Sequence, residues 1–96
     1  MAPPVAPYGS SPIFDEHSLP DSLRNEHSTR DGTWGLLRVL QGEVELVLLD
    51  PPSSRRVTVD DPAPIPPQSP HFVRLLGPVQ MQVEFYRENP LPDNPN

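Results

Sequence analysis

The chain has no cysteine, only five glycines and no long apolar run, and each absence excludes a class of protein. Without cysteine there is no disulfide framework and no thiolate chemistry, which is consistent with a cytoplasmic location. No run of about 18 apolar residues is present to span a membrane. The first twelve residues lack the basic and apolar regions of a secretory signal. We therefore expect neither a membrane protein nor a disulfide-linked secreted domain.

Proline, in contrast, is abundant, with 16 among 96 residues, and this density excludes long helices. The chain has 13 acidic and 7 basic residues, and the resulting formal charge of −6 argues against binding to nucleic acid. The length predicts one domain at 13–88, between a proline-rich N-terminal arm at 1–12 and a flexible C-terminal tail at 89–96. The alternative for the arm is packing on a neighbouring subunit through Val5 and Tyr8.

Short apolar segments separated by turn residues predict an all-β fold, a sandwich or small barrel. Strands are expected at Trp34–Leu40, Glu43–Leu49, Arg55–Val59, His71–Leu76 and Val79–Tyr86, with Pro64–Pro66 extended at a sheet edge. The turns at Gly42 and Gly77 predict two hairpins, 34–49 and 71–86. One helical turn is expected at Asp21–Asn25, capped by Asp21.

The strand Glu43–Leu49 is apolar on both of its faces. One small barrel cannot cover both faces, so we expect a homodimer. The predicted core consists of the apolar strand positions Leu36, Val39, Val44, Leu46, Leu48, Val57, Val73, Leu75, Val83 and Phe85.

Three histidines are the first candidates for chemistry. His17 lies in a polar run and is expected in solvent. His27 directly precedes the first long strand and is either a surface residue or a metal ligand. His71 follows a stiff proline-rich segment and shares strand parity with Val73 and Leu75, so its side chain is expected inside the barrel. It is there either a hydrogen-bonded core residue or a ligand.

The position of Glu84 depends on the register of the second predicted hairpin. A two-residue turn would place Glu84 opposite His71, as a third ligand or as a partner that orients the ring. An odd-length turn would bury the face that contains Val79 and Val83 and send Glu84 to the opposite face. The sequence leaves both registers open.

Arg38 and Arg74 lie within apolar strands. Facing inward, they would suit an anionic ligand. Pairing with nearby glutamates at the surface is the interpretation that we favour.

Two sequence segments resemble a known family. VLQGEVEL, followed by a proline-rich bend and PQSPHFVRLLGP, is similar to the two motifs of cupins. More narrowly, SLRNEHSTRDGTWGLLRVLQGEVEL with HFVRLLGPVQMQVEFY resembles the TehB/YeaR-like small cupin domain, which is associated with tellurite resistance. The resemblance covers Ser11 to Glu88. It implies a dimeric, cupin-like jelly-roll barrel with a metal site inside, formed by His27, His71 and Glu84. The chain departs from cupins in lacking the paired H-x-H and the following glutamate of the first motif.

We therefore predict a small metal- or ligand-binding domain linked to tellurite, oxyanion or metal stress. The cofactor would be a divalent metal, either zinc, nickel or iron, bound by His27, His71 and Glu84. One alternative is a metal-dependent cupin enzyme of the oxygenase or isomerase type. The other is a structural or interaction module without metal.

Overall fold

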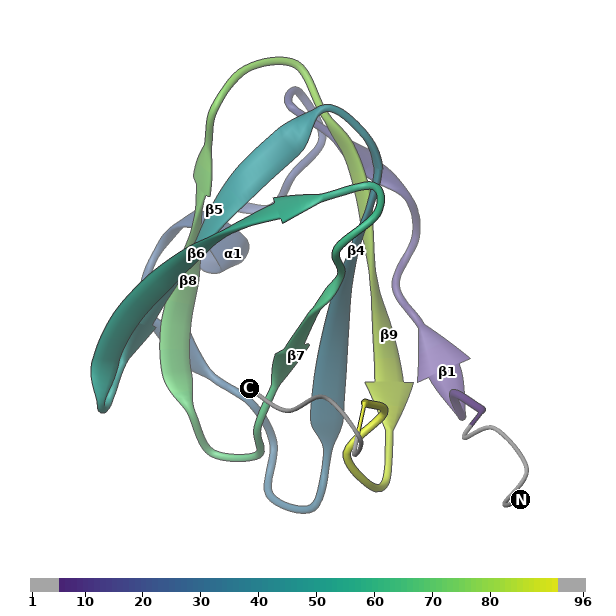
Figure 1. Cartoon of the computed structure of the whole chain (residues 1–96), viewed down its shortest axis with the longest axis vertical. Coiled ribbons are helices and arrows are strands. Elements are labelled where there is room, and N and C mark those ends of the chain that lie inside the picture. Colours follow the sequence, from purple (N-terminus) through teal and green to yellow (C-terminus); the bar gives the residue numbers. More distant parts are fainter. Residues whose placement is uncertain (1–5, 92–96) are drawn as a thin grey trace.

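The chain folds into two antiparallel β-sheets that face each other, with one short helix at their side (Figure 1). The computed structural model describes residues 6–91. The strands are β1 Gly9–Ser10, β2 Phe14–Asp15, β3 His27–Ser28, β4 Trp34–Gln41, β5 Glu43–Leu49, β6 Pro52–Thr58, β7 Ala63–Ile65, β8 Pro70–Leu75 and β9 Gln80–Tyr86. One sheet has the order β1-β9-β4-β7, with β2 also paired to β9, and the other has the order β3-β8-β5-β6. The predicted all-β class is confirmed. No ladder within residues 6–91 joins the two sheets into a closed barrel.

Both predicted hairpins are wrong, although the strands that compose them are present. β4 and β5 lie in different sheets, and so do β8 and β9. The turn residues specify that the chain reverses, but they do not specify whether the next strand joins the same sheet or the opposite one. The hairpin that does form joins β5 to β6, with register from Glu43↔Thr58 to Leu49↔Pro52. β6 is an edge strand, as predicted, and β7 lies at the edge of its sheet beside β4.

Two of the crossings between the sheets, from β4 to β5 and from β8 to β9, meet at Gly42. Gly42 has φ +80°, and a Cβ atom placed on it would overlap the carbonyl oxygen of Pro78, in the segment that joins β8 to β9. Glycine is therefore required at this point both by the backbone conformation and by the close approach of the second crossing.

Part of the predicted N-terminal arm belongs to the first sheet. The Tyr8 amide donates to the Phe85 carbonyl at 2.8 Å, and β1 continues this pairing along β9. The Tyr8 hydroxyl lies 2.9 Å from the Thr33 hydroxyl of the same chain. Val5, the other proposed anchor, lies outside the described residues, as do the rest of 1–5 and the tail residues 92–96.

The helix α1, Asp21–Arg24, forms where a helical turn was predicted, but its predicted cap is wrong. Pro20 occupies the N-cap position with φ −60° and ψ 145°, and no side chain caps the helix. Asp21 lies inside the first turn because the proline before it already has the extended conformation of a cap residue. No helix in the described part of the chain is long and apolar enough to cross a membrane.

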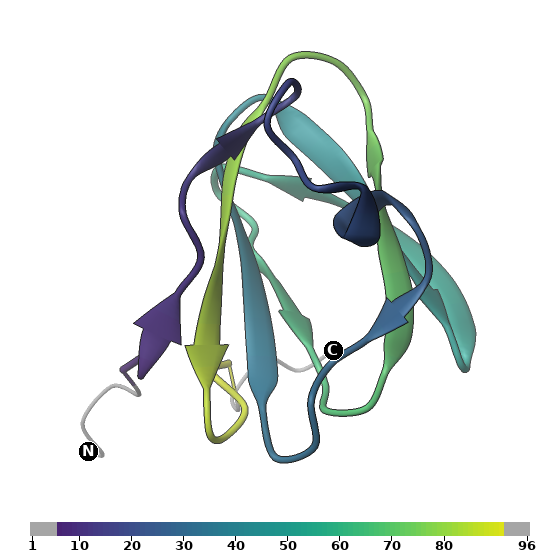
Figure 2. The ribbon, with the colours of Figure 1, turned by 180° about the vertical axis from the view of Figure 1, so that it is seen from behind.

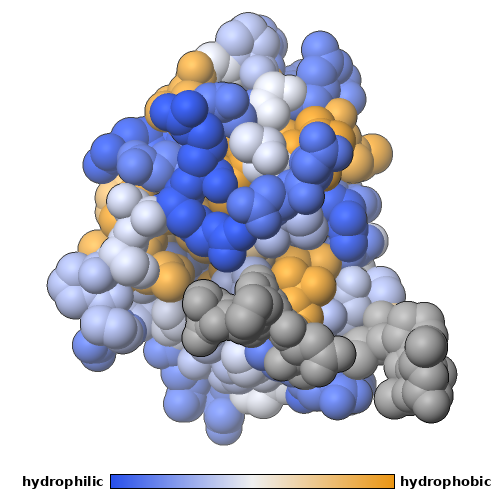
Figure 3. Space-filling model, in the orientation of Figure 1, coloured by the Kyte–Doolittle hydropathy of each residue, from blue (hydrophilic) through white to orange (hydrophobic). Residues whose placement is uncertain are grey.

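The hydrophobic core lies between the sheets. Of the predicted core residues, Leu36, Val39, Val44, Leu46, Val57 and Val73 are buried, while Leu48, Leu75, Val83 and Phe85 are half-buried. Buried residues that the sequence pattern missed are Leu19, Leu37, Ala63, Ile65, Val79, Met81 and Tyr86. The outer surface seen in Figure 3 is mostly hydrophilic, with hydrophobic residues in separate patches.

We predict that Gly42→Ala destabilises the protein far more than Gly32→Ala. Both glycines have positive φ, but a Cβ atom at Gly32 would have no neighbour within 4 Å. Gly32→Ala should therefore lose only about 1 kcal/mol, from backbone strain. Gly42→Ala should lose roughly 2 kcal/mol more, because the Pro78 carbonyl must move. Urea unfolding of both variants measures the difference, and equal losses would contradict the role assigned to the crossing.

The predicted homodimer would cover the outer face of the β3-β8-β5-β6 sheet. Val47, Leu49 and Phe72 lie half-buried on this face. Sedimentation equilibrium at micromolar concentration is expected to give twice the chain mass of 10.7 kDa. Val47→Glu should produce monomers, because it places a charge in an apolar interface. Val59→Glu, at an exposed position outside this face, is the matched control. A wild-type species of 10.7 kDa would exclude the dimer.

Candidate functional site

His71 lies on the inner face of β8. Residues along β8 alternate between buried and more exposed, and His71 and Val73 are the buried ones. The His71 side chain is almost completely enclosed, with a relative exposure of 4%. Its Nδ1–H donates to the Ser69 carbonyl at 2.7 Å. The segment before β8 is tied down by the Gln68 amide, which donates to the Thr29 carbonyl at 3.0 Å. The expectation that His71 points inward is confirmed.

His27 lies directly opposite His71. β3 pairs with β8 in the register His27↔His71, and the two ring centroids are 4.1 Å apart at an interplanar angle of 60°. His27 lies 3.0 Å from the Asn25 carbonyl through Nδ1. The structure therefore brings together the two histidines that the sequence singled out, although it does so through β3 and not through a hairpin.

The backbone contacts determine which nitrogen of each ring carries the proton. A carbonyl oxygen can only accept a hydrogen bond, so Nδ1 must be the protonated nitrogen in both rings. In a neutral imidazole this leaves Nε2 with a free lone pair. No hydrogen bond from residues 6–91 to either Nε2 atom is found. Each ring is thus held by one nitrogen, and the other is available as an acceptor or as a metal ligand.

Burial lowers the pKa of His71 below its ordinary value of 6.5, because the charged imidazolium would lose its hydration. The hydrogen bond to the Ser69 carbonyl opposes this lowering of the pKa, and electrostatic repulsion from the neighbouring His27 ring adds to it. His71 is consequently neutral at pH 7.

The histidine pair borders a cavity of about 330 Å³ between the two sheets. Its walls are mostly apolar and are formed by Phe14, Pro20, Leu23, Gly35, Leu37, Ile65, Val73, Met81, Val83 and Phe85. Polar side chains come from Ser11, Ser22, His27, Thr29 and His71. None of these lining residues is an aspartate, a glutamate or an arginine. The Oγ1 atom of Thr29 is buried and has no hydrogen-bond partner among the described residues.

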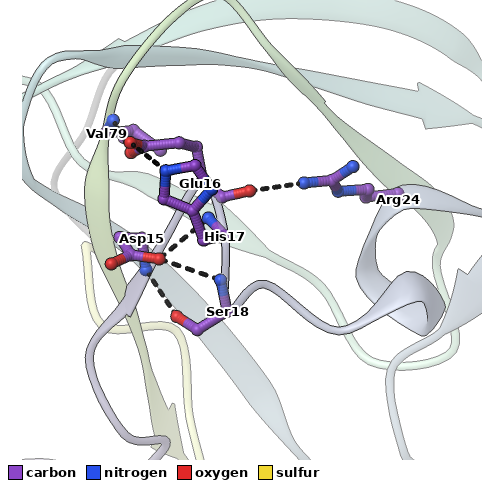
Figure 4. A network of polar contacts seen from close by, with 6 residues as sticks. All are labelled: Asp15, Glu16, His17, Ser18, Arg24 and Val79. Atoms are coloured by element: carbon purple, nitrogen blue, oxygen red, sulfur yellow. Dashed lines mark hydrogen bonds and ion pairs between the residues drawn. The ribbon is translucent and has the colours of Figure 1, made fainter.

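A network of polar contacts fixes the segment that closes one side of the cavity (Figure 4). Asp15 Oδ1 accepts hydrogen bonds from the amides of His17 and Ser18, both at 2.8 Å. Glu16 Oε1 accepts from the Val79 amide at 3.0 Å, and the Glu16 carbonyl accepts from Arg24 at 2.8 Å. These contacts lower the pKa values of both carboxyl groups. They also hold α1 and the start of β3 beside the two sheets, on the side that faces the viewer in Figure 2.

Glu84 does not join the histidine pair. Met81, Val83 and Phe85 of β9 line the cavity, and Glu84 lies on the opposite face of this strand. Its Oε1 atom accepts hydrogen bonds from Arg38 Nε at 3.1 Å and from the Tyr86 hydroxyl at 3.0 Å. Of the two placements that the sequence left open for Glu84, the structure has the one on the opposite face and not the one opposite His71, because β8 and β9 are in different sheets. Among residues 6–91, no group of three or more histidine, aspartate or glutamate side chains could hold a metal ion.

The remaining candidates lie at the surface. The His17 side chain is 84% exposed, as expected. Arg74 pairs with Glu45 at 2.8 Å, and Arg38 pairs with Glu84, so the ion-pair interpretation of both arginines is confirmed. Thr29 is the site residue that the sequence analysis missed. Its position two residues after His27 was the available signal, since strand parity places such residues on one face.

Together these features define a class of protein: a small all-β domain of two sheets, with an uncharged cavity between them and a histidine pair on its wall. The sequence profile of the TehB-like domain matches residues 9–83, and the chain belongs to this family.

Solved structures show the same fold. TehB from Haemophilus influenzae matches 86% of this chain with a TM-score of 0.75 and 26% sequence identity. The chain spans only 31% of that protein. A protein from Escherichia coli K12 matches 85% of this chain and 81% of its own length, with a TM-score of 0.76 and 18% identity. No curated protein sequence gives a significant match.

We predict that the His71 imidazole titrates below pH 6.5 in the folded protein. The unfolded chain then binds this proton more readily, so the free energy of unfolding should be highest above pH 6.5 and fall as the pH drops below that value. NMR titration of the imidazole resonances measures the pKa directly. In His71→Gln this contribution to the pH dependence of urea unfolding should disappear. A His71 pKa at or above 6.5 would contradict the burial argument.

Proposed function

We propose that this chain is a small-ligand- or metal-binding domain of the cupin jelly-roll type, and that His27 and His71 form its recognition group. The observation that carries the proposal is the cross-strand placement of the two rings on the wall of the cavity. Each ring is oriented by a backbone carbonyl through Nδ1, which leaves Nε2 of each ring as an acceptor, and the ring centroids are 4.1 Å apart. An apolar pocket with a few convergent polar groups is the usual form of a small-molecule site.

The physiological role that we propose is resistance to tellurite or to a related oxyanion or metal stress. Its support is membership of the TehB-like family and the similarity to part of H. influenzae TehB. Because the chain corresponds to less than a third of that protein, we carry over the stress response and no reaction.

A divalent metal is one candidate for the bound species. Metal-ligating histidines commonly donate their second ring nitrogen to a carbonyl or carboxylate, and both rings here are held in this way. Zinc, nickel and iron(II) all accept imidazole nitrogen. Two nitrogens are an incomplete ligand set, so solvent or a second ligand would have to supply the remaining donors. Glu84 is not available for this purpose, because it is engaged on the other face of its sheet.

The competing interpretation is a structural module in which the histidines only fill the core. In such a module a buried hydroxyl without a partner would only lower the stability of the fold, because burying one costs free energy. The unpaired Thr29 hydroxyl therefore supports the binding proposal.

Calorimetry and amide NMR with zinc, nickel, iron(II), potassium tellurite and uncharged hydroxylated aromatics test the proposal. At least one probe should bind stoichiometrically and perturb His27 and His71. Binding should vanish in His27→Ala/His71→Ala and persist in His17→Ala, the exposed-histidine control. Metal content after purification without chelators separates the metal candidate from the others.

Growth on potassium tellurite tests the physiological part. Cells expressing the wild-type protein should tolerate more tellurite than cells expressing the double variant at equal protein level. If no probe binds in a manner that depends on the histidine pair, the proposed function is wrong.

A further inference from the structure

We propose that the ligand of this cavity is an uncharged, largely apolar small molecule whose polar end contacts His27, His71 and Thr29 together. Its hydroxyl groups would donate hydrogen bonds to the two Nε2 atoms, and one of its oxygens would accept a hydrogen bond from the Thr29 hydroxyl. This inference rests on the proposed function and specifies the class of ligand bound at the same site.

The first feature that favours an uncharged ligand is the absence of acidic and arginine side chains from the cavity wall. None of the side chains that line the cavity is acidic or belongs to an arginine. The two arginines that were considered for an anionic ligand, Arg38 and Arg74, are already paired with Glu84 and Glu45. A charged ligand would leave water for a mostly apolar space without meeting an opposite charge, and such a transfer is strongly unfavourable.

Burial reinforces this argument at His71. The low exposure of its ring disfavours the imidazolium, so this residue does not supply a positive charge for an anion at neutral pH. A metal dication would find two imidazoles and no carboxylate among the residues that line the cavity.

The second feature is the pattern of hydrogen-bond donors and acceptors on the cavity wall. With Nδ1 of each ring protonated, both imidazoles offer an acceptor, and an acceptor is satisfied by a hydroxyl or amine donor. The Thr29 hydroxyl can donate as well as accept, and it is buried without a partner. His27, Thr29 and His71 all line the cavity, and two acceptors and one hydroxyl on its wall match a molecule with neighbouring hydroxyl groups.

The third feature is the apolar character of the rest of the cavity wall. Leu37, Ile65 and Val73 line the cavity together with Met81 and Phe85. Methionine and aromatic side chains make favourable contacts with an aromatic ring. The volume of about 330 Å³ lies within the usual range for small-molecule sites. An aromatic or cyclic body bearing hydroxyl groups therefore fits both ends of the cavity.

Catechol is the probe, because it carries two adjacent hydroxyl groups on an apolar ring and is uncharged at neutral pH. Its dimethyl ether veratrole has the same ring and no donor, and benzoate has a similar size with a negative charge. NMR titrations of the wild-type protein, with EDTA present to remove metal ions, should show catechol shifting the amide resonances of His27, Thr29 and His71. Loss of the donor bonds should weaken veratrole binding by at least about tenfold. Benzoate should bind more weakly than catechol.

Thr29→Val supplies a variant of nearly the same shape that keeps both histidines. It should weaken catechol binding roughly three- to tenfold, the effect of one lost hydrogen bond. It should also raise the melting temperature of the free protein, because it removes a buried hydroxyl without a partner. A lowered melting temperature together with unchanged catechol affinity would show that Thr29 is structural and would overturn its assigned role.

The outcomes separate this inference from the proposed function. If zinc or tellurite binds through the histidine pair and catechol does not, the ligand class is wrong and the proposed function stands. Catechol binding that survives in a folded His27→Ala/His71→Ala variant would overturn both. Absence of binding by every probe would likewise overturn both. Tighter binding of benzoate than of catechol would identify the site as one for anions.

Discussion

The close approach of Gly42 to the Pro78 carbonyl is the contact on which the arrangement of the site depends. It joins two of the places where the chain passes from one sheet to the other, the β4–β5 turn and the β8–β9 segment. Glu16 strengthens the same end of the molecule by accepting a hydrogen bond from the Val79 amide. The β4–β5 and β8–β9 crossings are in contact at this end, β8 and β9 lie in opposite sheets, and His71 pairs with His27 instead of Glu84.

This topology separates the charges of the protein from its cavity. Along β9, alternate side chains enter the space between the sheets or face outward, and Glu84 is among the outward ones. There it is satisfied by Arg38 and by the Tyr86 hydroxyl, and burial together with this carboxylate raises the pKa of Tyr86. The polarity that remains inside comes from imidazoles and hydroxyl groups, which can be buried at a much smaller cost than ions.

The sequence predicted the strands and failed on their connections, for a definite physical reason. The apolar run after Gly42 located β5 from Glu43 to Leu49 without error, and the stiff proline segment correctly indicated an inward His71. Both are local properties of the chain. The pairing of β8 with β3 and β5 is a property of the whole fold, and a turn such as Gly77-Pro78 is compatible with either sheet. The sequence left the position of Glu84 open because that position depended on a hairpin register, and the hairpin does not form. Thr29 was missed because its one signal, strand parity with His27, applies only if the extended chain continues past Ser28, which the sequence does not specify.

The polar groups of the interior that have no hydrogen-bond partner are what support a binding role for the cavity. Nearly every polar atom that enters the interior has a partner: Nδ1 of His71 has the Ser69 carbonyl, and the Thr29 carbonyl has the Gln68 amide. Against this background the Thr29 hydroxyl, which has no partner among the described residues, is an exception, and Thr29 lines the same apolar cavity as the two histidines. A protein of this size has a small core and little stability to lose. Carrying both a cavity and a buried hydroxyl without a partner lowers that stability, and a ligand that fills the space and pairs these groups would restore it.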